Sequence, residues 1–310
     1  MSDTMVSLRR QIRGAGDLHA VVRTMKALAA SSIGQYEQSV KALADYARTV
    51  ELGLSVCFRE GPPMALMEEP QRHTRTSPIG AVVFGSDQGL VGQFNEVIVD
   101  FAGKTLTGLS EHPHIVAVGE RVQARLVDAG LPVVESFPVP NSVKAITPLI
   151  GQILLESETR RSRGEFTELH LFYNSPTSRT EYIPITKRLL PLDETWGRQL
   201  TARSWPTGNL PEVLGTPTDT VRSLIHEYLF ISLFRACAES LAGENASRLA
   251  AMQRAEKNID ELLEKLSRRF HQLRQRSIDE ELFDVISGFE ALSKEATPPG
   301  HRGNREDRDS

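Results

Sequence analysis

The chain has 310 residues, of which 36 are Lys or Arg and 40 are Asp or Glu. The resulting net charge of -4 provides no basic field to attract nucleic acid or anionic lipid, so we expect no nucleic-acid partner. Two widely separated cysteines, Cys57 and Cys237, argue against a disulfide framework or a zinc site. No apolar run reaches the roughly 18 residues of a membrane span, and the first residues form no leader pattern. We therefore expect a soluble, cytoplasmic protein.

The first sixty residues carry a heptad pattern that predicts a long helix. No proline interrupts residues 8–54, and an unbroken helix of that length would be roughly 70 Å long. Gly14, Gly16, His19 and Lys26 interrupt the pattern, while frequent alanines permit close helix approach, so we expect the partner helix to come from the same chain. The two heptad positions are occupied by Leu8, Ala15, Val22, Ala29, Tyr36, Leu43 and Val50, and by Ile12, His19, Lys26, Ile33, Val40, Ala47 and Leu54.

After a turn-rich stretch at residues 61–78, short apolar runs alternate with helical patterns. This alternation predicts a βαβ series with a mostly parallel sheet. The last two runs, joined through residues 174–178, predict a hairpin and therefore an antiparallel edge strand. The fold class is α/β, with a Rossmann-like domain. The predicted strands are 79–84, 114–119, 131–137, 168–173 and 181–189, and the predicted helices are 94–109, 120–129 and 142–160.

The final third begins with an irregular connector at residues 191–217, which contains Trp196 and Trp205. The next proline after Pro217 is Pro298, and heptads through Met252, Ile259, Leu266 and Leu273, and through Leu249, Glu256, Leu263, Phe270 and Ser277, predict a second long helix. We expect this helix to pair with the first, so that an antiparallel coiled coil brackets the α/β domain. The predicted divisions are an N-terminal helix (1–60), a linker (61–78), the α/β domain (79–210), a C-terminal helix (211–294) and a disordered tail (295–310).

The first predicted strand ends in a glycine-rich turn, G-S-D-Q-G-L-V-G, at residues 85–92. A phosphate-binding P-loop needs Lys-Ser or Lys-Thr after its last glycine, but Gln93 and Phe94 follow here, and the spacing is not G-x-G-x-x-G. The favoured interpretation is structural: glycines supply positive φ and close helix–strand packing at a tight turn.

Other catalytic or metal-binding patterns are missing from the sequence. No H-E-x-x-H, G-x-S-x-G or EF-hand motif occurs, and the eight histidines are scattered. His112 and His114 stand close together without a further metal-ligand pattern, which favours a surface pair. We expect no catalytic residue, no cofactor and no metal site.

The second long helix carries a step in charge. A basic block without an acidic residue is followed at once by an acidic block. The simple interpretation is a solvated helix face; the alternative is a surface presented to a protein partner, where Arg forms bidentate carboxylate contacts. The basic residues are Lys265, Arg268, Arg269, Arg274 and Arg276, and the acidic ones are Asp279, Glu280, Glu281 and Asp284.

Several stretches, in order, resemble the gamma subunit of F-type ATP synthases. Residues 8–12 (LRRQI) and 25–31 (MKALAAS) are similar to I-R-x-x-I and M-x-M-V-A-A-S, and residues 85–95 are similar to S-T-D-R-G-L-C-G-x-x-N. Residues 239–252 (ESLAGENASRLAAM) resemble E-N-x-A-S-E-Q-A-A-R-M-x-A-M, and residues 274–282 (RQRSIDEEL) resemble R-Q-A-S-I-T-Q-E-L. The resemblance covers nearly the whole chain.

The resemblance implies a non-catalytic rotor subunit. In this family the two terminal helices form an antiparallel coiled coil inside a hexamer of alpha and beta subunits, while the α/β domain forms a foot on the membrane c-ring. It implies a central-stalk function that couples ion translocation to ATP synthesis or hydrolysis, with the alpha, beta and epsilon subunits and the c-ring as partners. The implied location is peripheral, on the cytoplasmic face of the cell inner membrane.

The resemblance also assigns contacts with the beta subunits. It implies that Arg274 and Gln275 engage the beta subunits, with Arg248, Asp279 and Glu281 beside them. Met25 and Lys26 match the family stretch that faces an acidic segment of beta.

Three departures from the family pattern limit what is implied. Asp279 replaces a hydroxyl residue and adds a negative charge, and Val91 replaces the usual Cys, so thiol regulation is not implied. Ser204-Trp205-Pro206 lacks the tyrosine-rich run usual after that Trp, and a hydrophilic tail follows Leu292. These departures suggest a divergent or alternate F-type complex. Two other hypotheses stay open from the residues alone: a Rossmann-like nucleotide-binding enzyme with helical oligomerisation arms, and a coiled-coil scaffold.

Overall fold

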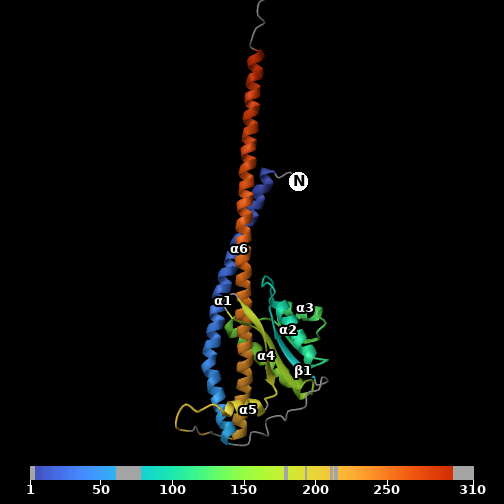
Figure 1. Cartoon of the computed structure of the whole chain (residues 1–310), viewed down its shortest axis with the longest axis vertical. Helices are drawn as coiled ribbons and strands as arrows, with labels where there is room; N and C mark the ends of the chain where they lie inside the picture. Colours follow the sequence, from blue (N-terminus) through green and yellow to red (C-terminus); the bar gives the residue numbers. More distant parts are fainter. Residues whose placement is uncertain are drawn as a thin grey trace, which may run out of the picture. The chain divides into compact units, whose positions relative to one another are not determined.

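The computed structural model describes residues 4–60, 78–177, 181–192, 194–209, 212 and 216–295. The predicted linker at 61–78 and the predicted tail at 295–310 fall almost entirely outside these residues. The elements, labelled in Figure 1, are α1 (Met5–Glu60), β1 (Ile79–Phe84), α2 (Phe94–Leu109), β2 (His114–Val118), α3 (Glu120–Asp128), β3 (Val133–Phe137), α4 (Val143–Ser162), β4 (Glu168–Pro176), β5 (Tyr182–Leu190), α5 (Glu194–Thr201) and α6 (Pro217–Glu295).

The five-stranded sheet confirms the predicted α/β class. Its strand order is β3-β2-β1-β4-β5, with parallel pairing from β3 through β4 and antiparallel pairing of β4 with β5. The parallel strands are connected by helices, as βαβ crossovers require, and the last two form the expected hairpin. β4 continues to Pro176, whereas the sequence predicted a turn from Asn174, because residues 174–176 pair with Pro184, Ile183 and Tyr182.

One helix was not predicted. α5 (Glu194–Thr201) lies inside the stretch expected to be an irregular connector. Its Leu200 is buried, and the ring of Trp196 packs on Tyr228 of α6 at a centroid distance of 5.1 Å. Tertiary packing of these two residues therefore stabilises a helix whose flanking prolines and glycines indicated a loop.

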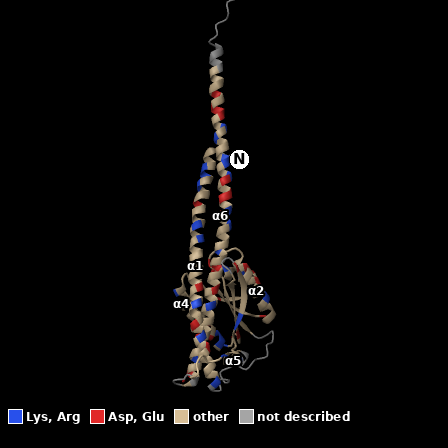
Figure 2. Ribbon diagram, turned by 60° about the vertical axis from the view of Figure 1, so that its left-hand side comes forward, with Lys and Arg blue, Asp and Glu red and all other residues tan. Residues whose placement is uncertain are grey.

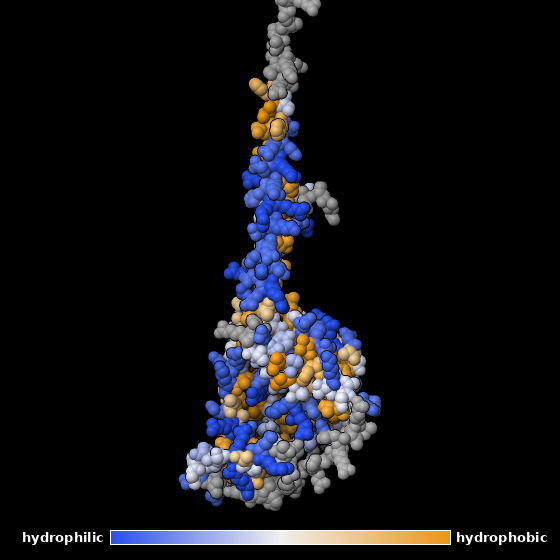
Figure 3. Space-filling model, viewed as in Figure 1, coloured by the Kyte–Doolittle hydropathy of each residue, from blue (hydrophilic) through white to orange (hydrophobic). Residues whose placement is uncertain are grey.

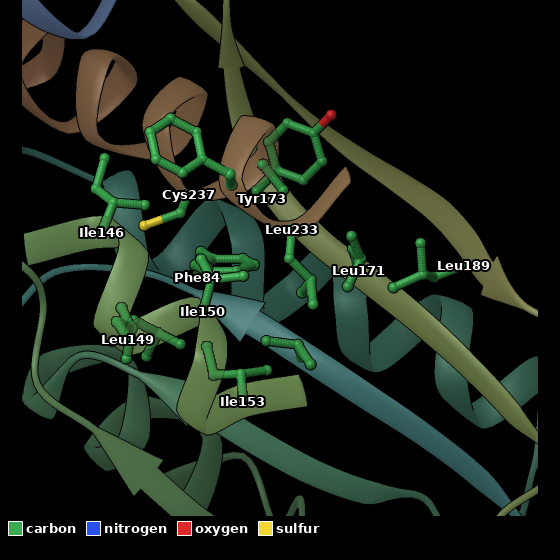
Figure 4. Close-up of a cluster of buried hydrophobic side chains, with 14 of the residues drawn as sticks. Phe84, Ile146, Leu149, Ile150, Ile153, Leu171, Tyr173, Leu189, Leu233 and Cys237 are labelled. Carbon is green, nitrogen blue, oxygen red and sulfur yellow. The ribbon is translucent and has the colours of Figure 1, made fainter. Parts of the chain in front are cut away.

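Two apolar cores lie on the two faces of the sheet. On one face, α2 and α3 cover Ala81 and Val83 of β1 and Phe172 of β4. On the other face, α4 and α6 pack over Phe84 and Leu171, and Figure 4 shows side chains of both helices meeting these strand residues. Strand residues pointing to both faces are thus buried, which explains why β1 is apolar throughout and does not alternate.

The chain divides into two compact units, Met1–Val22 with Ala255–Ser310 (the first unit) and Arg23–Arg254 (the second unit). In the first unit α1 and α6 pack against each other, with Leu8, Ala15 and Leu266 buried between them. The Arg9 guanidinium lies 5.5 Å from the centre of the Phe270 ring, and His19 Nε2 lies 3.1 Å from Asp260 Oδ1. From Arg9 to His19 the residue number rises along α1, while that of the contacted residue on α6 falls from Phe270 to Asp260. The two helices are therefore antiparallel, as predicted.

In the second unit the two long helices also pack against each other. Val50 and Leu54 of α1 form an apolar cluster with Ile231 of α6 and Leu200 of α5. The Tyr46 hydroxyl donates a hydrogen bond to Glu227 Oε2 at 2.9 Å, again pairing α1 with α6. The heptad positions predicted on α1 therefore meet a helix of the same chain in each unit.

Charged residues occur along much of the length of both long helices, as the colours of Figure 2 show. Across the described residues, no helix combines the length and apolar character that a bilayer crossing needs.

Close helix–strand packing at Gly85 gives a test of this arrangement. A Cβ placed there would lie 2.3 Å from Val122 Cβ of α3, whereas a Cβ on Gly151 of α4 would meet nothing within 4 Å. We expect Gly85→Ala to lower the free energy of unfolding by about 1–3 kcal/mol through overpacking. Gly151→Ala, the control, should raise it by about 0.5–1 kcal/mol through helix propensity. Denaturant titration of both variants measures this, and equal changes would contradict the packing described at Gly85.

Candidate functional site

The glycine-rich turn between β1 and α2 is closed by its own polar side chains. The Ser86 amide donates to Asn95 Oδ1 at 3.0 Å, and Asn95 Nδ2 donates to Ser86 Oγ at 2.8 Å. Both residues are buried. Asn95, in the first turn of α2, therefore fixes the path of the chain as it leaves the sheet.

The structure confirms the structural interpretation of the glycines. Gly92 has φ +59°, and Gly85 packs so closely on α3 that a side chain would overlap Val122. Leu90, which is exposed, also takes a positive φ of 63°. The Gly85 amide donates to the Val118 carbonyl, and the Ser86 amide is used by Asn95, so these two groups are not offered to a phosphate.

The turn is joined to α6 and β4 by a small buried contact, which we call the junction: Val91, Phe94, Asn174, Gly243 and Ser247. The Ser247 hydroxyl donates to the Val91 carbonyl, and Asn174 Nδ2 donates to the Phe94 carbonyl at 2.9 Å. A Cβ on Gly243 would lie 2.9 Å from the Asn174 carbonyl oxygen and 3.5 Å from the Phe94 ring. Gly243 thus lets the backbone of α6 approach β4 closely.

One turn before the junction, a buried acid ties α6 to β4 again. Glu239 Oε2 accepts a hydrogen bond from the Ser175 hydroxyl at 2.9 Å, and Oε1 accepts one from Arg235 Nε at 2.6 Å. Burial, and then the Glu239 charge, raise the pKa of the neighbouring Tyr173 hydroxyl. Both carboxylate oxygens of Glu239 are therefore satisfied inside the fold.

A second buried acid, Glu244, lies on the other side of the junction. Its Oε1 pairs with Arg248 Nη2 at 2.7 Å, and the two side chains are 7% and 13% exposed. Its Oε2 has no hydrogen-bond partner among the described residues. Burial raises the pKa of Glu244, the Asp87 charge adds to the increase, and Arg248 opposes it. Burial and the Glu244 charge likewise raise the pKa of Tyr36 on α1.

Three of the residues predicted to contact beta lie in the second unit. Met25 and Lys26 are half-buried on α1. Arg248 is bound internally, because Glu244 accepts from one of its terminal nitrogens and Asn245 Oδ1 accepts from the other at 3.4 Å.

The other four predicted contact residues lie in the first unit, on α6. Arg274, Gln275, Asp279 and Glu281 are exposed, and Gln275 Nε2 donates to Asp279 Oδ1 at 3.5 Å. Large apolar side chains near them are also exposed, and hydrophobic colour gathers at this end of α6 in Figure 3. They follow a helical spacing that the sequence analysis did not use: Ile278, Leu282, Val285, Ile286 and Phe289.

The junction residues on β4 and α6, and the acid beside them, were not identified from the sequence. Asn174 was assigned to a turn, and Gly243, Glu244 and Ser247 were noted only as part of a resembling stretch. A usable signal was present in Gly243, because a glycine inside a long helix without proline suggests close backbone approach.

Removing the Asn174 side chain tests the junction. Asn174 is fully buried, so Asn174→Ala removes its hydrogen bond to the Phe94 carbonyl, leaves a small cavity, and should lower the free energy of unfolding by about 1–3 kcal/mol. Gln152→Ala, at an exposed site on α4, should change it by less than about 0.5 kcal/mol. Urea unfolding followed by circular dichroism compares the two, and an Asn174→Ala effect as small as the control would refute the junction.

Comparisons with known proteins agree along most of the chain. A family model described as "ATP synthase" matches residues 4–292. The ATP synthase gamma chain of Desulforamulus reducens is 27% identical over 291 residues, covering 92% of this chain and 98% of the relative. That of Moorella thermoacetica is 26% identical and covers 93% and 99%.

Solved structures share the fold. A chain from the rotor of the Euglena gracilis mitochondrial ATP synthase matches with a TM-score of 0.61 at 15% identity, covering 88% of this chain and 98% of that one. A chain from the OSCP/F1/c-ring structure of the same enzyme gives 0.64 at 15% identity, covering 97% and 98%. With the family model spanning nearly every residue and two long antiparallel-packed helices bracketing the sheet, the chain belongs to the ATP synthase gamma-chain family.

Proposed function

We propose that this chain, a non-catalytic central-stalk subunit of an ATP synthase, meets the alpha and beta subunits through its long helices and the epsilon subunit and c-ring through its α/β domain. Its role is to couple ion translocation in the membrane sector to ATP synthesis or hydrolysis carried out by other chains. The observation that carries this function is the family match over residues 4–292. The partner assignments go further than that match and rest on the features below.

The long helices support the assignment to alpha and beta. In the first unit, α6 leaves apolar residues such as Leu282 and Phe289 exposed, at 56% and 73%. An isolated helix gains little from such positions, but a surrounding protein sleeve would bury them. Acidic residues lie among them, at Asp279, Glu280, Glu281 and Asp284, so the surface is not continuously apolar.

We assign the contacts with beta to Met25, Lys26, Arg248, Arg274, Gln275, Asp279 and Glu281. The assignment of Arg274 has the best support, because Arg274 is exposed and makes no hydrogen bond or ion pair with any residue that the structure describes. Its guanidinium is therefore available for a carboxylate of a partner. The assignment of Arg248 has the least support, because its guanidinium already forms an ion pair with Glu244.

We also propose a cellular location and a separate role for each part of the chain. The chain is part of a membrane-associated complex, and we place it peripherally on the cytoplasmic face of the cell inner membrane. Residues 79–210 would then act as the foot, with residues 1–60 and 211–294 as the shaft.

The enzyme alternative is not favoured, because the Gly85 and Ser86 amides of the glycine-rich turn are hydrogen-bonded within the fold.

Replacing Arg274 tests the contact with beta. If the guanidinium meets a carboxylate at a partly desolvated interface, Arg274→Ala should cost about 2 kcal/mol or more of coupling or assembly free energy, whereas a solvated Arg loses less than about 1 kcal/mol. Gln275→Ala should show a smaller loss in the same direction. The measurements are ATP-driven rotation torque, ATPase rate and yield of the assembled complex.

The control is Arg222→Ala, another exposed Arg on α6, which forms an ion pair with Asp219 at 3.5 Å. Arg254 is less suitable, because its Nη2 lies 3.6 Å from the Cβ position of Gly92. Equal, negligible effects at Arg274 and Arg222 would show that the basic block is only a solvated face. A loss of helicity in the free Arg274→Ala chain would reassign that residue to the coiled coil.

A further inference from the structure

The side-chain amine of Lys187, on β5, lies in the contact between that strand and α6, within the second unit. Its nitrogen donates a hydrogen bond to Ser232 Oγ at 3.2 Å and lies 5.5 Å from the centre of the Tyr228 ring. Ser232 is buried, while Tyr228 and Lys187 are half-buried. Because Tyr228 and Ser232 are one helical turn apart, α6 presents an aromatic ring and a hydroxyl to the same amine.

Lys187 lacks the carboxylate partner that a partly buried cation usually has. Among the residues that the structure describes, its contacts are a hydroxyl and an aromatic face, and no Asp or Glu forms an ion pair with it. Two arginines of α6 are held differently, since Arg235 and Arg248 each meet a Glu oxygen, at 2.6 Å and 2.7 Å. The ammonium form of Lys187 is therefore less well stabilised than these guanidinium groups.

The surroundings of Lys187 favour the neutral amine. Burial lowers the pKa of Lys187, and the Arg235 charge adds to the decrease, whereas Glu51 of α1 and Glu239 of α6 oppose it. These groups and Tyr228 are the charged and titratable groups that face the amine from α1 and α6. A desolvated lysine beside another cation is an arrangement that makes the amine nucleophilic near neutral pH, because only the neutral form has a free lone pair.

We propose that Lys187 is a site of direct N-acylation by small acyl phosphates. The neutral amine attacks the carbonyl carbon, the bond between this carbon and the phosphate oxygen breaks, and phosphate leaves with the electron pair. The nitrogen then loses one proton to solvent, and an amide is formed. Because Lys187 is half-buried, a donor with a short acyl chain should react more readily than a bulky one.

The simpler interpretation is that Lys187 only fills the contact between β5 and α6. Its rate of acylation would then follow exposure alone, so exposed lysines such as Lys104 of α2 and Lys144 of α4 would react faster at every pH. The two interpretations therefore differ in how the rate depends on pH and on the charges near the amine.

Acylation at this position would act on the packing of α6. Lys187 would lose its positive charge, and with it the cation–π contact to Tyr228, and it would gain an acyl group in the same contact. Lys187 is paired with Leu171 of β4 in the antiparallel ladder, so the added group lies close to the interior of the sheet. We therefore expect the modification to weaken the attachment of α6 to β5.

The test incubates the full-length chain with acetyl phosphate at pH 7 and at pH 10, where a large share of ordinary lysine is neutral. Peptide mass spectrometry gives the initial rate of acetylation at Lys187 and at Lys144. Dividing the ratio of these two rates at pH 7 by the same ratio at pH 10 removes the effect of access. We expect a quotient above about three, because the neutral fraction of Lys187 changes less over this range. A quotient near one would overturn the proposal.

Two charge variants give opposite predictions at pH 7. Glu51→Gln removes a charge that opposes the lowered pKa and leaves Arg203 without its partner, so the Lys187 rate should rise about twofold or more. Arg235→Gln removes a neighbouring cation, so the same rate should fall about twofold or more. Glu37→Gln is the control, because it changes another half-buried acid of α1 that does not act on the amine.

Circular dichroism at both pH values establishes that each chain is folded, and Glu51→Gln decides the matter if Arg235→Gln is not. The control variant should react at Lys187 as the unchanged chain does. Equal Lys187 rates in the unchanged chain and in folded Glu51→Gln would overturn the proposal. The outcome is independent of which subunits the chain contacts.

Discussion

The fold of the second unit depends on one stretch of α6 that is packed on nearly every side. From Ile231 to Ser247 every residue is buried except Arg235. α1, α4 and the sheet all contact this stretch, so it cannot present a single apolar stripe as an amphipathic helix does. Small residues make this possible: Ala236, Ala238, Ala242, Gly243 and Ala246. The closest approach is at Gly243, where only the absence of a Cβ leaves room for the Asn174 carbonyl.

Two acids of this stretch, Glu239 and Glu244, are buried with it, and their hydrogen bonding differs. Glu239 and Glu244 each pair with an Arg one helical turn away, Arg235 and Arg248. The first pair is completed by Ser175 from β4, which satisfies the second oxygen. In the second pair Glu244 Oε2 has no hydrogen-bond partner among the described residues. The same buried helix therefore holds one acid with both oxygens hydrogen-bonded and one acid with a single bonded oxygen.

Much of the fold could be predicted from the sequence because its elements have strong periodicities. The heptads of α1 identified Leu8, Val22, Ala29 and Val50 as buried, and all four are. Short apolar runs located β1 and β2 almost to the residue. These signals are local, since each depends only on neighbouring residues and on burial.

The junction could not be predicted in the same way, because it depends on residues far apart in the sequence. Asn174 and Phe94 are separated by 80 positions, and Ser247 and Val91 by 156. Tertiary contact also produced α5, where the packing of Trp196 outweighed the flanking turn formers. The contacts with beta stay a prediction, since they require surfaces that belong to other chains.

The central claim is that α6 and the glycine-rich turn form one cooperative unit through the junction. Native-state hydrogen exchange tests it most directly, by comparing the opening free energy of the Ser86 and Asn95 amides with that of the Gly243 and Glu244 amides. The account predicts equal values, at the level of global unfolding of the second unit. Exchange of the turn amides at a much lower free energy, with α6 still protected, would show that the turn opens alone and would contradict the account.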